Sequence, residues 1–382
     1  MSIKPFSFFQ PGMVRFGAGS SAGAGALLKE LGLNRVLLLS DRGLEKAGMV
    51  KKMEESLAAA GIAFETFLDV EANPSIETVE KGIGLFREKD LQGILCLGGG
   101  SPMDTAKAVS VVISNGGRVQ DYEGPHKVKA PVIPVLAVPT TAGTGSEVTP
   151  FAVITNRETS FKFSIFSYEI IPREAVLDPE LITSLPAPVA ASTGMDALTH
   201  AMEAYLSLAA STFSDAMAEK AIELLLRHIR AFVANRADLE AASGMLLGSM
   251  FAGLAFSWGR LGNVHAMAHP LGGYYDMPHG IANAVLLPTI LEYNALADKG
   301  KYRRMHSYFN TEIREPFHPL MLVEEVRRLS ADLGIPAGLS QLGVGSDKIP
   351  AMARDAMKSA NVAINPRQTT LQDIQDLYLR AL

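Results

Sequence analysis

The stretch Gly93-Ile-Leu-Cys-Leu97 runs directly into Gly98-Gly-Gly-Ser101-Pro-Met-Asp104, and this junction decides the expected fold. The first five residues form an apolar run, which is typical of a strand buried on both faces of a parallel sheet. A tight glycine turn follows, and a helix is expected from Thr105 to about Ser114. Such a turn lets a backbone approach a phosphate, and the free N–H groups of the helix favour its negative charge. A dinucleotide site is therefore predicted here, with a ligand-free turn as the alternative.

The same alternation of strand and helix extends over the first half of the chain. A buried strand is expected at 36–40, further strands at 63–68 and 132–138, and helices at 20–31, 45–60 and 76–89. Two hairpins are expected as well, one over 5–17 and one over 151–166. Alternating strands and helices predict a parallel sheet covered by helices, which is the Rossmann-like α/β architecture of dinucleotide-binding domains.

Beyond Leu181 the pattern changes, because strand signals nearly disappear and helical periodicity takes over. Helices are expected at 187–208, 212–235, 237–258, 260–272, 280–297, 300–308, 318–334, 346–358 and 370–381. A chain of 382 residues is long enough for two domains. We therefore expect an α/β NAD-binding domain over residues 1–185 and an all-helical domain over residues 186–382.

Composition narrows the possible functions. A hydrophobic content of 48% and a charged content of 20% suit a globular enzyme with a large core. The net charge of −5, without a long basic run, argues against nucleic acid and anionic membranes as partners. The single cysteine, Cys96, excludes an internal disulfide and fits a reducing compartment. We see no signal peptide and no uninterrupted apolar stretch of membrane length, so a cytoplasmic protein is expected.

Five residues of the helical half have side chains that suit a metal ion. Asp196 and His200 are four residues apart, as are His265 and His269, and this spacing puts both members of a pair on one face of a helix. His279 follows in a Pro-His-Gly loop. A carboxylate and several imidazoles suit a borderline divalent metal such as Fe(II) or Zn(II). The alternative is that His265 and His269 are core histidines bonded to backbone carbonyls.

Asp41 ends the strand expected at 36–40, where dinucleotide-binding domains place a carboxylate that accepts a hydrogen bond from the ribose. A carboxylate at this point favours NAD, because it repels the 2′-phosphate of NADP. Capping of the next helix is an equally good explanation for Asp41. Upstream, Gly17-Ala-Gly19-Ser-Ser-Ala22 also fits a dinucleotide fingerprint, but the strand before it is short and the match is weak.

Four blocks of the sequence together resemble the iron-dependent, group III alcohol dehydrogenases. These blocks are Gly98–Lys107, Pro139–Glu147, Gly194–His200, and His265–His269 with Pro278–Asn283. Their order and spacing fit the family from end to end, so the resemblance covers nearly the whole chain. It implies an α/β dinucleotide-binding domain followed by an all-helical domain, the fold shared with dehydroquinate synthase-like proteins. It also implies a homodimer or a larger homo-oligomer.

The resemblance assigns sites residue by residue. The metal ligands of the family correspond to Asp196, His200, His265 and His279. His269 corresponds to a position near the nicotinamide and the substrate, where it would position the substrate or relay a proton. Contacts with NAD are implied for Asp41, Gly98, Gly99, Gly100, Ser101, Asp104, Thr140, Thr141, Thr144, Ser146 and Lys162.

The implied reaction is a hydride transfer between an alcohol and the nicotinamide ring, with the metal as Lewis acid at the substrate oxygen. Phe151, Phe256 and Trp258 fall close to pocket positions of the family. They favour unbranched primary alcohols, aldehydes or a short diol over a charged polyol, although packing of a domain interface explains them equally well. Two rival functions are a glycerol dehydrogenase-like or dehydroquinate synthase-like enzyme, and a protein that binds NAD or metal without catalysis.

Overall fold

The computed structural model describes residues 5–8, 12–159, 161–309 and 315–382. The chain divides into two compact units, which we call the sheet unit and the helical unit. The sheet unit comprises Phe9–Thr141 and Gly145–Thr183, and the helical unit comprises Met1–Phe8, Ala142–Thr144 and Ser184–Leu382. The main change from one unit to the other therefore falls between Thr183 and Ser184. The short segment Ala142–Thr144, which follows a strand of the sheet unit, belongs with the helices.

The main sheet of the sheet unit has the strand order β1-β9-β6-β4-β2-β3, and each neighbouring pair is parallel. The strands are β1 (Met13–Phe16), β2 (Arg35–Leu39), β3 (Ala63–Phe67), β4 (Gly93–Gly98), β6 (Val135–Pro139) and β9 (Glu174–Leu177). β4 and β6 are buried along their whole length, which explains their unbroken apolar sequences. The chain passes from β2 outward to β3 and then returns to β4 on the other side of β2, so the winding direction reverses between β2 and β4.

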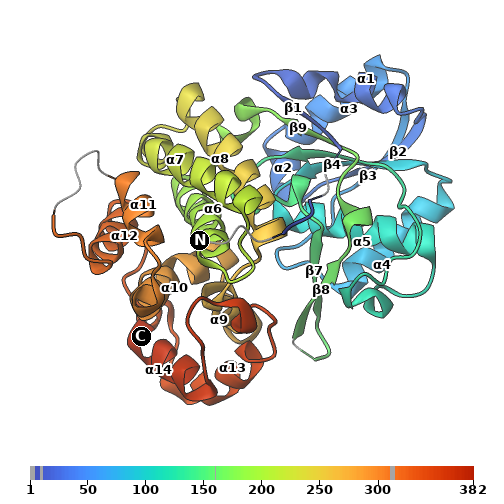
Figure 1. The fold of residues 1–382 in the computed structure, drawn as a ribbon. Helices are drawn as coiled ribbons and strands as arrows, with labels where there is room; N and C mark the ends of the chain where they lie inside the picture. Colours follow the sequence, from blue (N-terminus) through green and yellow to red (C-terminus); the bar gives the residue numbers. More distant parts are fainter. Residues whose placement is uncertain (1–4, 9–11, 160, 310–314) are drawn as a thin grey trace. The chain divides into compact units, whose positions relative to one another are not determined.

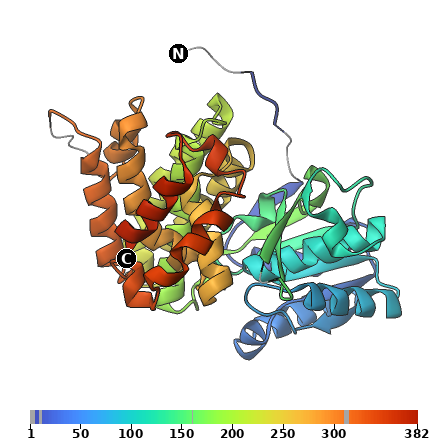
Figure 2. The same ribbon diagram turned by 90° about the horizontal axis from the view of Figure 1, so that it is seen from below.

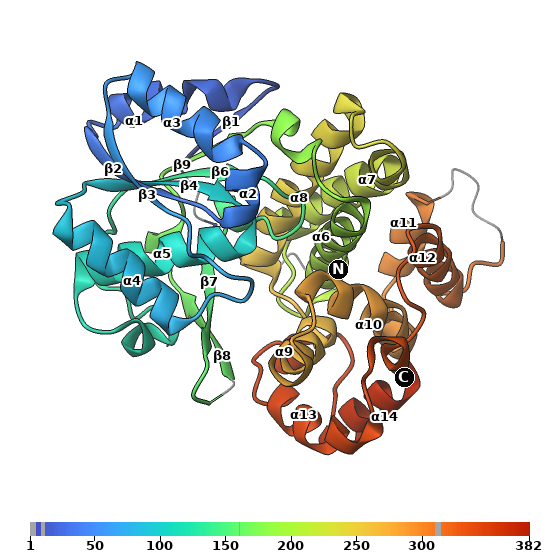
Figure 3. The same cartoon turned by 180° about the vertical axis from the view of Figure 1, so that it is seen from behind.

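Helices cover both faces of this sheet. α1 (Ala24–Glu30) and α3 (Met49–Ala59) lie on one face, and α4 (Ile76–Glu88) and α5 (Gly100–Asn115) lie on the other, as Figures 1 and 3 show. Leu28 of α1 and Met53 of α3 pack with Leu38 and Leu95 of the strands in one buried core. Alternate strand residues supply this core, and the predicted α/β architecture is confirmed.

Two local predictions for this half are wrong. The hairpin expected over 5–17 is not formed by the described residues, because β1 pairs in parallel with β9, a strand far along the chain; residues 9–11 lie outside the described part. The helix expected over 45–60 is two helices, α2 (Arg42–Lys46) and α3, because Gly48 adopts a φ of +75° between them. The second hairpin is confirmed, since β7 (Phe151–Asn156) and β8 (Phe161–Phe166) pair antiparallel.

The helical unit contains no strand among its described residues, as predicted. Its long helices are α6 (Ala187–Leu206), α7 (Thr212–Ala234), α8 (Leu239–Gly259), α9 (Asn263–Tyr275) and α10 (His279–Asn294). They are followed by α11 (Lys301–Ser307), α12 (Leu320–Asp332), α13 (Ile349–Ala356) and α14 (Leu371–Ala381). In Figure 2 these helices, coloured from green to red, pack together side by side.

α8 is long and apolar enough to cross a membrane by length and composition, with a mean hydropathy of 1.4. It packs against α6 and α7, however, and 67% of its most apolar 18-residue stretch is buried inside the protein. α8 is therefore a core helix. It is apolar around its whole circumference because other helices cover it on several sides.

Candidate metal centre and cofactor turns

Three helices bring together four potential metal ligands. Asp196 and His200 lie one turn apart on α6, His265 lies in the first turn of α9, and His279 begins α10. One ligand atom from each lies within 4.8 Å of all the others. We call these residues the four-donor group. Asp196, His200 and His265 are only 3%, 4% and 1% exposed, whereas His279 is partly exposed.

The distances within the four-donor group suit a single divalent ion. Oδ2 of Asp196 lies 4.0 Å from Nδ1 of His200, and its Oδ1 lies 4.0 Å from Nε2 of His265 and 3.9 Å from Nε2 of His279. Ligands of one ion with bonds of about 2.1 Å lie roughly 3 to 4 Å apart, depending on the angle between the bonds, so these separations are close to those of a metal site. Within the described part of the chain, the buried Nδ1 of His200 has no hydrogen-bond partner. A buried polar atom without a partner is costly, so the donor set fits a metal.

The surroundings favour the neutral form of the two most buried histidines of the group. Burial lowers the pKa of His200, while Asp196 and a hydrogen bond with the Gly143 backbone act in the opposite direction. Burial also lowers the pKa of His265 well below its ordinary value, and the neighbouring histidines add to this effect. A neutral imidazole retains the lone pair that a metal needs. The His200 ring is also held between two rings, since its centroid lies 4.5 Å from those of Phe256 and His265.

Glu203 is a functional candidate that the sequence reasoning missed. Its Oε2 lies 2.6 Å from Nδ1 of His265. Burial raises the pKa of Glu203 to about 7, although hydrogen bonds from the backbone at Val264, Gly262 and His265 oppose the rise. The available signal was spacing, because Glu203 follows His200 by three residues and lies on the same helical face.

Asn283 was also missed. It lies one turn after His279 on α10 and is fully buried. Its Nδ2 donates to Oδ1 of Asp196 at 2.6 Å and lies 3.1 Å from Nε2 of both His265 and His279. One amide thus touches three members of the four-donor group. The spacing of four from His279 was the only sequence signal for it.

His269 lies one turn after His265 on α9 and is partly exposed. Its ring stacks on that of His279 with a centroid separation of 5.5 Å and an angle of 25°. It is not a member of the four-donor group. The structure therefore places His269 beside the group rather than inside it.

The predicted phosphate turn, Gly98–Ser101, joins β4 to α5. Gly99 is the N-cap of α5, and no side chain caps this end of the 16-residue helix. A Cβ on Gly98 would lie 2.4 Å from Cγ of Pro102, so only glycine fits there. The turn therefore presents a helix N-terminus whose first backbone N–H groups suit an anion.

Asp41 follows β2 and is the N-cap of α2. Its Oδ1 accepts hydrogen bonds from the backbone N–H groups of Gly43 at 2.8 Å and Leu44 at 3.0 Å. Helix capping therefore occurs, but both bonds use one oxygen of the carboxylate. Ser40 donates to the Leu97 carbonyl at 2.9 Å and so ties the end of β2 to the end of β4. These two ends flank the point where the winding of the sheet reverses, which is where open α/β sheets bind ligands.

The second loop begins at the end of β6, beside the first. The backbone N–H of Thr140 donates to the Gly98 carbonyl at 3.1 Å, and a Cβ on Gly99 would lie 3.0 Å from Oγ1 of Thr141. Thr144 belongs to the three-residue segment that packs with the helical unit. There, a Cβ on Gly143 would lie 2.8 Å from Cβ of Thr193.

Two of the predicted cofactor residues have partners inside the sheet unit. Ser146 donates to Oδ1 of Asp104 at 3.0 Å, and the buried Lys107 ammonium donates to Ser146 at 2.9 Å. Asp104 also accepts from the backbone of Val153 at 3.0 Å. Burial raises the pKa of Asp104 to about 6 and lowers that of Lys107 to about 8. These contacts fix the second loop on α5.

Lys162 on β8 donates to Oδ1 of Asn73 at 2.7 Å. Asn73 has a φ of +56°, a conformation that asparagine tolerates better than most residues, and it was not predicted as a site residue. At the weak upstream fingerprint, Gly19 and Ser21 donate their backbone N–H groups to Asp178, both at 3.0 Å. That turn therefore uses its donors on a carboxylate of the protein itself.

The three predicted pocket aromatics lie in different units. Phe256 and Trp258 are on α8 of the helical unit, and Phe256 stacks on His200. Phe151 begins β7 of the sheet unit and stacks on Phe166 with centroids 4.9 Å apart. Phe256 is therefore in direct contact with the four-donor group.

Comparison with known proteins gives the family. Residues 11–179 match the family described as iron-containing alcohol dehydrogenase, and residues 190–382 match the C-terminal part of the Fe-containing alcohol dehydrogenase family. The 1,3-propanediol dehydrogenase of Citrobacter freundii is 41% identical over 386 residues, covering 100% of both chains. The NAD-dependent methanol dehydrogenase of Bacillus methanolicus is 34% identical over 98% of this chain and 100% of that one.

A solved structure, that of an alcohol dehydrogenase from Oenococcus oeni, superposes with a TM-score of 0.96 and 36% identity. The superposition covers 99% of this chain and 100% of the other. Sequence and structure thus agree over the full length, and the resemblance predicted from the four blocks is confirmed. The chain belongs to the iron-containing alcohol dehydrogenase family, and it is a metal-dependent oxidoreductase that transfers a hydride between an alcohol and NAD.

Proposed function

We propose that residues 186–382 form the metal-binding domain of this enzyme and that the four-donor group holds Fe(II). The observation that carries the proposal is the approach of four donor atoms from three helices to within 4.8 Å of one another. The ion, when bound, supplies Lewis-acid stabilisation at the substrate oxygen. Zn(II) is the alternative ion, because a carboxylate and three imidazoles suit both metals.

His269 serves the reaction without binding the metal. Its partial exposure and its stacking on His279 support this role, because a partly exposed imidazole next to the metal ligands can exchange protons with solvent. We assign it the task of positioning the substrate hydroxyl or relaying its proton.

Residues 1–185 form the NAD-binding domain in this proposal. The turn at Gly98–Ser101 receives the pyrophosphate. Asp41 accepts a hydrogen bond from a hydroxyl of the adenosine ribose, through the carboxylate oxygen that does not cap α2. Thr140, Thr141, Thr144, Ser146 and Lys162 complete the cofactor contacts, with Asp104 holding Ser146 in place. The ends of β2, β4 and β6, three adjacent parallel strands, support this assignment.

The substrate in this proposal is an unbranched primary alcohol or a short diol, with the matching aldehyde in the reverse direction. Phe256, packed on His200, supports an apolar pocket wall. The names of the related 1,3-propanediol and methanol dehydrogenases support small primary alcohols over a polyol. Glycerol is the competing substrate.

The enzyme works as a homodimer in the cytoplasm in this proposal. β1 is an edge strand of the main sheet, and its Met13 and Phe16 are 57% and 44% exposed. An edge strand with exposed apolar side chains favours pairing with a second copy. The single thiol, Cys96, is buried and unpaired, as suits a reducing compartment.

The test is to strip the metal, restore Fe(II) or Zn(II) without oxygen, and follow NAD reduction with 1-butanol, 1,3-propanediol and glycerol. We expect activity to return with Fe(II) and to be faster on the first two substrates than on glycerol. Return with Zn(II) alone would change the metal, and faster turnover of glycerol would overturn the substrate class. Sedimentation at micromolar concentration would test the dimer.

A further inference from the structure

Glu203 closes the N-terminal end of α9 from a different helix. The N-cap residue of α9, Gly262, has no side chain to accept from the first N–H groups. Glu203, on α6, takes that part: its Oε1 accepts from Val264 N at 2.7 Å, and its Oε2 faces His265 N at 3.4 Å. A carboxylate at this end is favoured by both the free N–H groups and the helix dipole.

The same carboxylate sits against the ring of a proposed metal ligand. Oε2 of Glu203 lies 2.6 Å from Nδ1 of His265, slightly shorter than the roughly 2.7–2.9 Å of a charge-assisted N–H···O hydrogen bond. Backbone N–H groups face both oxygens of Glu203 and favour its ionised form, which only accepts, so the proton of this bond lies on Nδ1 of His265. In a neutral ring the lone pair is then on Nε2, the atom that faces Asp196 across 4.0 Å.

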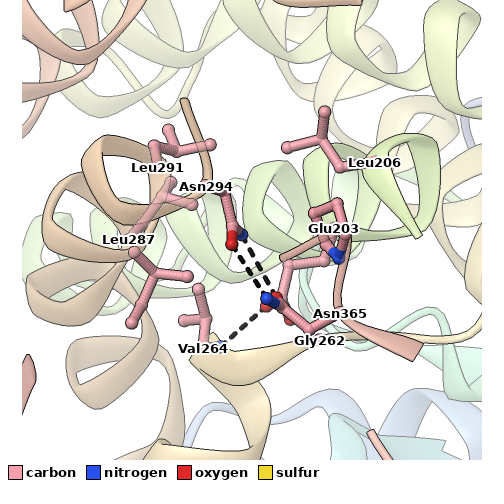
Figure 4. Close-up of a pocket in the computed structure, with 10 residues that line it drawn as sticks. Glu203, Leu206, Gly262, Val264, Leu287, Leu291, Asn294 and Asn365 are labelled. Atoms are coloured by element: carbon pink, nitrogen blue, oxygen red, sulfur yellow. Dashed lines mark hydrogen bonds between the residues drawn. The ribbon is translucent and has the colours of Figure 1, made fainter. Parts of the chain in front are cut away.

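Glu203 also borders a small cavity with mostly apolar walls. A cavity of about 10 Å³, the size of one water molecule, borders this side chain and is walled by Leu206, Leu287 and Leu291 among others (Figure 4). The two amides at the cavity, Asn294 and Asn365, bond to each other at 2.8 and 3.1 Å. Burying a carboxylate in such surroundings is expensive unless it is well paired, so the contacts to α9 are what hold it.

We propose that Glu203 is a positioning residue, which fixes the tautomer and orientation of His265 so that Nε2 is presented to the metal. The inference rests on the proposed function, because it takes His265 as a ligand. Carboxylates that accept from the second nitrogen of a metal-bound histidine commonly act in this way, and their loss costs about 10- to 100-fold in metal affinity.

A purely structural role, as a cap for α9, is the competing explanation. Glu203→Gln separates the two because an amide has the same shape but only one accepting end. If its oxygen serves Val264, its NH₂ faces Nδ1 of His265 and drives the ring proton to Nε2, which blocks ligation. In this arrangement the hydrogen bond that caps α9 is kept, but Nε2 of His265 carries the proton and has no lone pair for the metal.

The first measurement is made on the metal-free wild-type protein labelled with ¹⁵N-histidine. Long-range ¹H–¹⁵N correlation reports which nitrogen carries the proton, and His265→Ala identifies the signals. We expect His265 to be protonated on Nδ1 in the wild type and on Nε2 in Glu203→Gln. Protonation on Nε2 in the wild type would overturn the inference without any appeal to the variant.

The second measurement is Zn(II) affinity, by competition with a chromophoric chelator. We expect Glu203→Gln to bind about 10- to 100-fold more weakly than the wild type, with Glu203→Asp, which keeps an acceptor, between them. Glu219→Gln is the matched control, because Glu219 lies in the same unit but bonds to Tyr205 and Tyr308 at 2.7 and 2.9 Å. Its Zn(II) affinity should stay within twofold of the wild type.

The outcomes distinguish a failure of the Glu203 inference from a failure of the proposed metal site. If the wild type binds Zn(II) and Glu203→Gln binds it equally well, the inference fails and the metal site stands. A thermal shift in Glu203→Gln without a change in tautomer or affinity would mean that Glu203 is only a cap. If the wild type and His265→Ala bind Zn(II) alike, the proposed site itself is wrong.

Discussion

The amide nitrogen of Asn283 lies 2.6 Å from Oδ1 of Asp196, and this contact joins α10 to α6 at the centre of the four-donor group. Asn283 is fully buried, and its Oδ1 has no hydrogen-bond partner in the described part of the chain. The amide is thus held by its nitrogen alone. It satisfies a lone pair of the buried carboxylate and keeps that side chain aimed at the histidines.

Replacing Asn283 by leucine should weaken metal binding. Leu has a similar volume but no N–H, so Oδ1 of Asp196 would lose the donor that holds it in place. We expect about a tenfold loss of Zn(II) affinity, measured by chelator competition. The thermal unfolding midpoint shows whether the variant is folded. An unchanged affinity in a folded variant would mean that Asp196 needs no support from α10.

His265 and His269 should separate metal binding from turnover. His265→Ala removes a member of the four-donor group, so we expect metal and activity to be lost together. His269→Ala leaves that group intact, so most of the metal should stay while NAD reduction slows by about 10²- to 10⁴-fold. Metal per chain by mass spectrometry and steady-state kinetics decide. Equal metal loss in both variants would contradict the role assigned to His269.

Local pattern was enough to predict most helices of this chain. The helix expected over 212–235 is α7, Thr212–Ala234, because its periodicity is strong and Ser211 caps its start. The pairing of β1 could not be predicted in this way, since its partner β9 lies about 160 residues further on and no local signal encodes such a partner. The hairpin prediction failed for that reason.

The same distinction between local pattern and long-range contact applies to the candidate site. Helical spacing predicted that Asp196 and His200 share a face, and His279 was a candidate from its Pro-His-Gly loop. The resemblance then separated the four ligands from His269. Glu203 and Asn283 were not predicted, because a carboxylate or an amide on a helix is ordinary until the fold shows what it touches. Their contacts to His265 and Asp196 cross between helices, and no spacing within one helix reports them.

Asp41→Ser should relax the preference for NAD over NADP. The carboxylate repels a 2′-phosphate, and serine removes that charge while remaining a good N-cap for α2. We expect kcat/KM for NADP relative to that for NAD to rise at least tenfold, with little change in thermal stability. Asp69→Ser is a matched control, because Asp69 pairs with Arg42 near the same strand ends. An unchanged ratio would leave Asp41 as a helix cap alone.

The stability of the protein should carry a pH signature from Glu147. Burial raises the pKa of Glu147 from 4.5 to about 7, with Lys107 opposing the rise. Because its folded pKa exceeds the unfolded value, the folded protein binds more protons between them. The contribution of Glu147 to the free energy of unfolding therefore falls as pH rises from about 4.5 to about 7. Glu147→Gln cannot titrate, so its stability relative to the wild type should rise across that window.

Urea unfolding at pH 5 and pH 8 measures this difference. We expect Glu147→Gln to gain on the order of 2 kcal/mol on the wild type between the two pH values, because a shift of one pKa unit corresponds to about 1.4 kcal/mol. Glu158→Gln, the same substitution at an exposed position, is the matched control. A flat difference for Glu147→Gln would mean that its carboxylate is already well paired in the folded protein, and that Lys107 outweighs its burial.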